Sequence, residues 1–165
     1  MNYKTDTTRG FYTLKNPNKY ISSVKPVYKS GWEFKMFDLF DTHPSIIHWG
    51  YECIDIYYRH PLKGQSVYKP DIFIIGVDCN GNEIKYLLEI KPFKMTMLPT
   101  KPKVPTTKNA KNGTRYKKAM QRYEEAVIDY AVNEAKWDAA RIWCAKHKVI
   151  WKLITEENTG NLFTM

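Results

Sequence analysis

Cysteine is scarce in this chain, with three residues among 165. Cys53, Cys79 and Cys144 are odd in number, widely spaced and form no CxxC pair, so they favour neither a disulfide framework nor a zinc site. We expect all three to be small buried apolar residues. The histidines likewise lack a metal-binding spacing such as HxxxH, and we expect them to be structural: His43, His48, His60 and His147.

Long apolar runs are also absent. No segment approaches the ~20 apolar residues that a bilayer-spanning helix needs, and the first ten residues, MNYKTDTTRG, lack the apolar stretch of a secretory signal. We therefore expect a soluble, intracellular protein that does not enter a membrane. Hydrophobic residues still make up 43% of the sequence and aromatic residues 15%. This composition predicts a single domain with its own core over residues 1–165.

Acidic residues are missing from one long stretch of the chain. The sequence has 26 Lys and Arg residues against 17 Asp and Glu residues, a net charge of +9. Between Lys91 and Lys118 there are nine basic residues and no acidic one, so this stretch accounts for the entire net charge. Most charge runs are solvated loops, but a run without acids indicates an anionic partner such as the DNA backbone. The candidate DNA-binding residues are Lys94, Lys101, Lys103, Lys108, Lys111, Arg115, Lys117 and Lys118.

Turn-forming residues and apolar periodicity divide the chain into a small number of elements. In chain order we expect an irregular N-terminal arm (1–29), a helix (30–41), a strand (51–58), a hairpin (69–92), a mobile basic loop (92–114), a long helix (115–147), a strand (149–155) and a short helical turn (155–158). The order helix, three strands, long helix, strand predicts an α/β fold with a mixed β-sheet flanked by helices, its last strand parallel. An aromatic stripe of the long helix is expected to pack in the core: Tyr116, Tyr123, Tyr130 and Trp137.

The turn of the expected hairpin decides which charged residues meet. A two-residue loop at Asn80 and Gly81 would put Asp71 and Glu89 on opposite faces of the sheet. The sequence DCNG also suits a three-residue loop that begins as a type I turn at Asp78 and has Gly81 in the left-handed conformation. In this second register Asp71 faces Glu89.

Facing carboxylates indicate a metal site. The two Cβ atoms would lie ~5 Å apart on one face, with Lys91 on the same side, and like charges so placed destabilise a sheet unless a cation lies between them. Mg²⁺ suits two carboxylates and the backbone carbonyl of Ile90, and Mn²⁺ is expected to substitute for it. Such a metal would activate water, while Lys91 would stabilise the attacking hydroxide or the charge on the phosphate. The pattern predicts phosphodiester hydrolysis of a nucleic acid.

Pro70-Asp71 followed by Glu89-Ile90-Lys91 resembles the PD-(D/E)xK motif of the restriction-endonuclease-like superfamily. Further segments resemble the head-completion nucleases of contractile-tailed bacteriophages, which are relatives of the end-cleaving endonuclease subunit of certain transposons. These segments are LKNPNKYISSVKPVYKSGWEFKMF, PSIIHWGYE, LEIKPFKMTMLPTKPK and YAVNEAKWDAARIWCAKHKVIWKLITEE. They span nearly the whole chain in the family's order, and the family's core has the same order of helices and strands.

The resemblance implies a Mg²⁺-dependent endonuclease that cuts duplex or branched DNA while phage heads are completed. Such a protein would act in the cytoplasm of the infected host, or associated with the virion, and would have phage head or neck proteins as partners. The alternative that we keep is a non-catalytic DNA-binding protein of the head–tail neck. Cutting both strands of a duplex commonly needs two active sites, so a homodimer is a further alternative.

The same resemblance implies roles for individual residues. Glu33 corresponds to the family's helical acid, Asp71 and Glu89 to its metal ligands, and Lys91 to its catalytic lysine. Asn133 and Lys136 match polar positions of the later helix that support the site, although Glu134 stands where the family has glutamine. Glu33 has a second interpretation, because Ser30 with Glu33 three residues later also fits a helix capping box.

Overall fold

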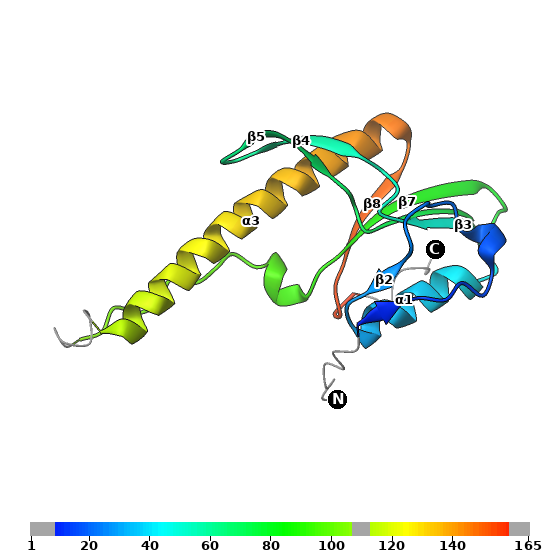
Figure 1. Ribbon diagram of the computed structural model, residues 1–165. Helices are drawn as coiled ribbons and strands as arrows, with labels where there is room; N and C mark the ends of the chain where they lie inside the picture. Colours follow the sequence, from blue (N-terminus) through cyan, green and yellow to red (C-terminus); the bar gives the residue numbers. More distant parts are fainter. Residues whose placement is uncertain (1–8, 107–112, 159–165) are drawn as a thin grey trace.

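The computed structural model describes residues 9–106 and 113–158. Its centre is a four-stranded sheet in the order β3-β6-β7-β8 (Figure 1). The strands are β3 (Ile46–Tyr51), β6 (Ile72–Val77), β7 (Glu83–Ile90) and β8 (Ile150–Ile154). The first three pair antiparallel, whereas β8 returns after a helix and pairs parallel with β7. The mixed sheet and the parallel last strand are therefore confirmed.

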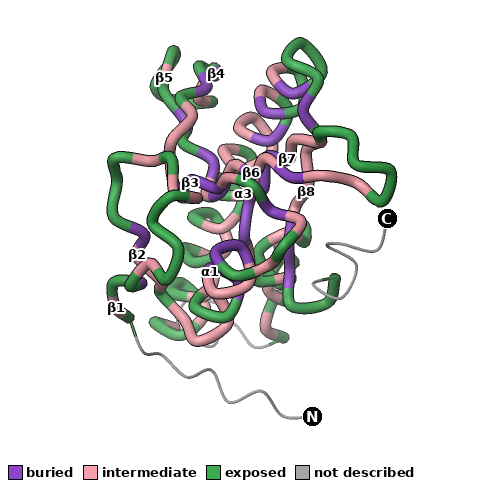
Figure 2. The backbone as a smooth tube through the Cα atoms, turned by 90° about the vertical axis from the view of Figure 1, so that its right-hand side faces the viewer, coloured by how far each residue is buried: buried purple, intermediate pink, exposed green. Residues whose placement is uncertain are grey.

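Two helices pack against this sheet, one on each face (Figure 1). Helix α1 (Gly31–Thr42) buries Phe37 and Phe40 against one face, in a cluster that includes Leu88. Helix α3 (Thr114–His147) buries Ala140 and Cys144 in a cluster on the other face that includes Leu87. Successive side chains of a strand point to opposite faces, so Leu88 of β7 packs on the α1 side of the sheet and Leu87 on the α3 side. Figure 2 shows the buried positions gathered in the middle of the molecule.

The N-terminal arm is held against α1 by one buried carboxylate. The arm contains β1 (Gly10–Phe11), the 3-10 helix η1 (Pro17–Lys19) and β2 (Val27–Tyr28), so it is less irregular than expected. Asp41 is fully buried and accepts hydrogen bonds from the backbone N–H groups of Lys15 (2.6 Å) and Asn16 (3.1 Å). It also accepts one from Nε1 of Trp49 at 3.3 Å. One side chain thus joins the arm, α1 and β3.

The strand expected over 51–58 does not exist as one element. Strand β3 ends at Tyr51, and Glu52 has a left-handed backbone with φ 46°, which breaks the extended chain. The following residues form β4 (Ile56–His60), which pairs with β5 (Gly64–Tyr68) in a separate two-stranded ribbon packed against α3. The prediction of one strand over 51–58 was wrong. The strand that pairs with β6 at the edge of the sheet is Ile46–Tyr51, which ends where Glu52 turns the chain.

The long helix follows the expected boundaries closely, and the described part of the loop before it contains a short 3-10 helix, η2 (Phe93–Thr96). The N-terminal half of α3 extends beyond the sheet (Figure 1). Trp137 is therefore buried as expected, whereas Tyr116, Tyr123 and Tyr130 are only half-buried. At the other end of the chain, residues 155–158 form a hydrogen-bonded turn instead of a helix.

The cysteines differ in environment, against the expectation that all three are buried. Cys144 is buried on α3, but Cys53 is half-buried and Cys79 is exposed. Cys79 lies in the turn of the β6–β7 hairpin, and hairpin turns are usually at the surface. A separate observation concerns membranes: within the described ranges 9–106 and 113–158, the structure has no helix with the length and apolar character of a membrane span.

We expect Asp41→Ala to lower the free energy of unfolding by about 3 kcal/mol, because four donors, including the Tyr12 hydroxyl and a buried indole N–H, lose this acceptor. Urea unfolding measures this change. Asp138→Ala is the matched control, because Asp138 is exposed and pairs only with Arg141 one turn along α3. Equal stability of the two variants would contradict the role given to Asp41.

Candidate active site

The β6–β7 hairpin has the register with the three-residue loop. Gly81 N–H donates to the carbonyl of Asp78 at 3.0 Å, Asp78 N–H donates to the carbonyl of Asn82 at 2.9 Å, and Gly81 has φ 81°. Ile72 then pairs with Leu88. Asp71, which directly precedes β6, is therefore brought opposite Glu89, as expected.

The charged residues predicted for the site meet at the ends of β6 and β7 that lie away from the turn. Oδ2 of Asp71 accepts a hydrogen bond from the N–H of Ile90 at 2.7 Å. Nζ of Lys91 lies 3.2 Å from Oε1 of Glu89, and the hydroxyl of Tyr68 donates to Oε2 of the same carboxylate at 2.5 Å. Glu89 is only 3% exposed. The structure thus brings Asp71, Glu89 and Lys91 together in a largely buried cluster.

The charge of Glu89 disfavours ionisation of Asp71. Burial and then the negative charge of Glu89 raise the pKa of Asp71 to about 8, although the N–H of Ile90 and the ammonium groups of Lys91 and Lys29 act in the opposite direction. The free energy of ionising Asp71 is therefore high in the absence of a further positive charge. A cation bound at this place would lower it.

Lys91 remains protonated in this environment. Burial by itself lowers the pKa of a lysine, but the negative charges of Glu89 and Asp71 outweigh burial, so the pKa of Lys91 is raised. Glu33 contributes to the same rise, which places the first turn of α1 within electrostatic reach of the site. The ammonium group is thus a fixed positive charge beside two carboxylates.

Glu33 itself caps its helix. Its N–H donates to Oγ of Ser30 at 3.1 Å, and its carboxylate accepts a hydrogen bond from the N–H of Lys29. This is a variant of the capping box, with the carboxylate reaching one residue further back than usual. The helical-acid role of Glu33 stays a prediction, while its capping role is observed.

The carbonyl of Ile90 points to the same side as Asp71. The N–H of Ile90 donates to Asp71, whereas the N–H of Lys91 donates to the carbonyl of Ile154 on the β8 side. In an extended strand the N–H and C=O of one residue point to the same edge. The Asp71 carboxylate and the Ile90 carbonyl oxygen therefore lie at the same edge of β7, and Glu89 is the residue before Ile90. This donor set fits a hard divalent cation such as Mg²⁺, which prefers oxygen ligands.

Histidine and cysteine do not supply an alternative metal site in the part of the chain that the structure describes. Residues 9–106 and 113–158 contain no group of three or more His, Cys, Asp or Glu side chains arranged to hold a metal ion. The pair of carboxylates with the Ile90 carbonyl is thus the candidate that the fold offers.

Of the two supporting residues expected on α3, one lies near the cluster. Nζ of Lys136 is 5.6 Å from the ring centroid of Tyr68 and 6.0 Å from that of Tyr58. Asn133 instead lines an open groove of about 710 Å³ between α3 and the loop, together with Lys94 and Tyr130. The structure therefore connects Lys136, but not Asn133, to the residues around Glu89.

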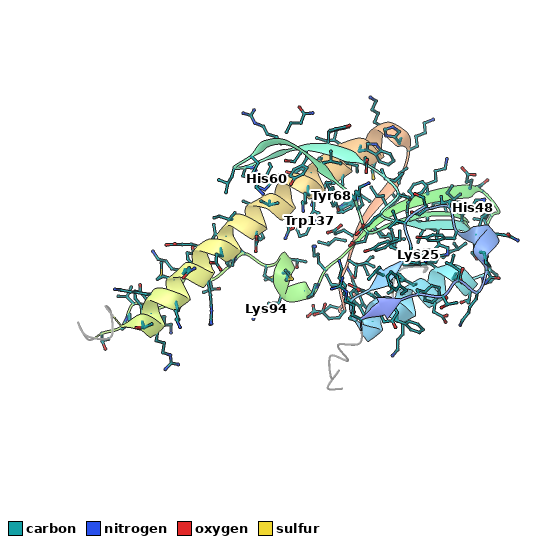
Figure 3. The ribbon with its side chains drawn as sticks, in the orientation of Figure 1. Lys25, His48, His60, Tyr68, Lys94 and Trp137 are labelled. Atoms are coloured by element: carbon teal, nitrogen blue, oxygen red, sulfur yellow. The ribbon has the colours of Figure 1, made fainter. Side chains whose placement is uncertain are left out.

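The basic residues expected to bind DNA lie on the loop and on the start of α3. Figure 3 shows Lys94 on η2, away from Tyr68 and Trp137, which lie where α3 meets the sheet. Of the eight residues, Lys108 and Lys111 lie outside the described residues. The other six are all exposed: Lys94, Lys101, Lys103, Arg115, Lys117 and Lys118. This basic surface begins within a few residues of Lys91.

Two residues of the site were missed from the sequence. Tyr68 contacts Glu89 although it belongs to the separate β4–β5 ribbon, and Lys29 acts on Asp71 although it belongs to the arm. Neither has a motif around it. The one available signal for Tyr68 was its position three residues before Asp71.

Comparison with known proteins identifies the family of the chain. Residues 43–156 match the family described as TnsA-like endonuclease N terminal. The chain belongs to this family. It is also 33% identical over 150 residues to the head completion nuclease of Enterobacteria phage T4, with 90% of this chain and 91% of the relative covered. No solved structure matches the chain.

Membership of the TnsA-like endonuclease family accounts for the architecture. The matched residues contain the four strands of the sheet and all of α3, which together with α1 form an α/β restriction-endonuclease-like core. The same residues contain Asp71, Glu89 and Lys91. The family resemblance found in the sequence is therefore confirmed.

In EDTA, we expect the free energy of unfolding to fall as the pH rises from about 4 to about 8. The pKa of Asp71 is about 8 in the folded chain and ~3.9 in an unfolded one, so between these values the folded state binds the extra proton. At ~1.4 kcal/mol per pKa unit, the fall amounts to a few kcal/mol. Urea unfolding at several pH values measures it.

Asp71→Asn should flatten this pH dependence, because the amide does not titrate. Asp138→Asn, at an exposed position of α3, should leave the dependence as it is. The same slope in Asp71→Asn as in the wild type would show that Asp71 is not the group responsible.

Proposed function

We propose that this member of the endonuclease family is a Mg²⁺-dependent endodeoxyribonuclease that acts on DNA during phage head completion. The observation that carries the chemistry is the facing pair Asp71 and Glu89 beside the protonated Lys91. The similarity to the T4 head completion nuclease supports the biological setting, including the infected cell as its place of action. The basic loop supports DNA as the substrate.

Asp71, Glu89 and the Ile90 carbonyl would hold the divalent cation. When bound, the cation supplies an activated water and neutralises charge on the phosphate. Lys91 then has two tasks at the same place: its ammonium group stabilises hydroxide, and it attracts the phosphoryl oxygens on which negative charge develops. The water would give up one proton to bulk solvent, and attack of its oxygen on phosphorus would form one P–O bond while the P–O bond to the leaving sugar oxygen breaks. The leaving sugar oxygen would take a proton from solvent.

The surrounding charges support this division of roles. Glu89 keeps the Lys91 ammonium group at 3.2 Å and so points it toward the carboxylates. Lys29 lowers the pKa of Asp71 and so favours its ionised form, which is the form that binds a cation. Glu33 adds negative charge near Lys91 and helps to keep it protonated.

DNA would be held by the exposed basic residues of the loop and of the start of α3. These long, solvated lysine and arginine side chains suit contacts to phosphates, which carry no sequence information, more than contacts to bases. Arg115, Lys117 and Lys118 lie in the first turns of α3, where positive charge opposes the helix macrodipole. A phosphate bound there would offset this unfavourable interaction.

Purified protein should cut supercoiled and linear DNA in Mg²⁺ or Mn²⁺ and not in EDTA, and Glu89→Gln should reduce the rate at least about a hundredfold because a metal-binding charge is lost. The matched control is Glu83→Gln at the exposed opposite end of β7, which should keep the wild-type rate. Unchanged cutting by Glu89→Gln would refute the assigned site. Tight DNA binding by a wild-type protein that never cuts would favour the structural neck protein.

Replacing Lys101 and Lys103 together by alanine should weaken DNA binding and reduce the slope of log affinity against log salt by about 1 to 2, since up to two phosphate contacts are lost. Fluorescence anisotropy in EDTA measures binding without cleavage. The control with the same change of charge is Lys25→Ala with Lys63→Ala, at exposed positions outside the loop. Equal slopes for the two double variants would exclude the loop as the DNA-binding surface.

A further inference from the structure

Tyr68 connects the β4–β5 ribbon to the candidate site. It is the last residue of β5 and is 4% exposed. Its hydroxyl donates to Oε2 of Glu89, so a buried phenol and a buried carboxylate satisfy one another.

The two oxygens of Glu89 have partners from different elements. Oε1 contacts Nζ of Lys91 on the same strand, and Oε2 accepts from Tyr68 on the ribbon. Two contacts on opposite sides fix the plane of a carboxylate, whereas one contact would leave it able to rotate. Each oxygen has a second lone pair, so the bond from Tyr68 leaves an acceptor position for a cation.

The ring of Tyr68 is itself held in place. It packs in the cluster that contains Ile56, Leu87, Ala140 and Cys144, which come from the ribbon, the sheet and α3. Lys136 of α3 adds its ammonium group 5.6 Å from the ring centroid. Figure 3 shows Tyr68 where these layers meet. The hydroxyl therefore cannot swing away from Glu89 without disturbing three elements.

We propose that Tyr68 is a positioning residue whose hydroxyl orients the Glu89 carboxylate for a divalent cation. This inference rests on the proposed metal-dependent function. In this proposal the β4–β5 ribbon, which lies outside the four-stranded sheet, helps to position a metal ligand through Tyr68. Partners of metal ligands typically change metal affinity or activity by about 10 to 100-fold when they are removed.

Tyr68→Phe tests the proposal because it removes only the hydroxyl. Tyr58→Phe is the matched control: Tyr58 is also buried, lies on the same ribbon and faces the same Lys136, but its hydroxyl is not bonded to Glu89. Calorimetry with Mn²⁺ alone should show binding at least about tenfold weaker in Tyr68→Phe and within about twofold of the wild type in Tyr58→Phe. DNA affinity in EDTA should be the same in all three proteins.

Cleavage kinetics provide a second measurement. Tyr68→Phe should need about tenfold more Mg²⁺ for half-maximal rate and should recover most of the maximal rate at saturating Mg²⁺, because orientation is lost and the ligands remain. Equal Mn²⁺ affinity in Tyr68→Phe and the wild type would overturn the role of Tyr68 and leave the proposed nuclease intact. An equal loss in Tyr58→Phe would also overturn it.

A wild-type protein that binds no Mn²⁺ would overturn the proposed metal site and this inference together.

The wild-type chain also permits a test without any variant. With tyrosine labelled by ¹³C at Cζ, saturation with Mg²⁺ should shift the assigned signal of Tyr68 and not that of Tyr58, because only the former hydroxyl is bonded to a metal ligand. An unmoved Tyr68 signal would count against the proposal even if Tyr68→Phe failed to fold.

Discussion

The opposition of Asp71 and Glu89 on neighbouring strands is the constraint on which the rest of the site depends. The three-residue turn after Asp78 sets it, since a loop one residue shorter would turn one of the two carboxylates to the other face of the sheet. Burial then makes two negative charges costly, as the pKa of Asp71 near 8 records. A bound cation would relieve this repulsion, which is the physical basis for proposing metal-dependent chemistry.

Several elements converge on β7 to orient its charged end. The strand itself supplies Glu89 and Lys91, and the ribbon supplies Tyr68. Helix α3 adds Lys136 on the outer side of Tyr68, and the first turn of α1 adds the charge of Glu33. The central strand is buried on both faces, so its end is a rigid place for groups whose orientation matters.

The proposed DNA binding and the proposed chemistry would use different kinds of surface in this chain. The carboxylates and Lys91 are largely buried, and their properties depend on a few close neighbours. The basic residues of the loop and of the start of α3 are exposed, and their effect comes from summed charge that salt screens. A short covalent connection from Lys91 to Lys94 joins the two surfaces. This arrangement suits the proposed function, in which the basic surface contacts DNA phosphates.

The sequence by itself determined those features that depend on nearby residues: the α1 cap at Ser30 and the unbroken basic run. It limited the hairpin to two possible turns, and the structure has the three-residue turn ending at Gly81 with the register that it sets. The family motif made Asp71, Glu89 and Lys91 recognisable for the same reason. Only the tertiary structure decided that Ile46–Tyr51 is the edge strand, because Glu52 breaks the chain and pairing with β6 selects the partner. It also decided that Tyr68 reaches Glu89, since this contact joins a separate ribbon to the sheet and depends on packing between layers that no local pattern encodes.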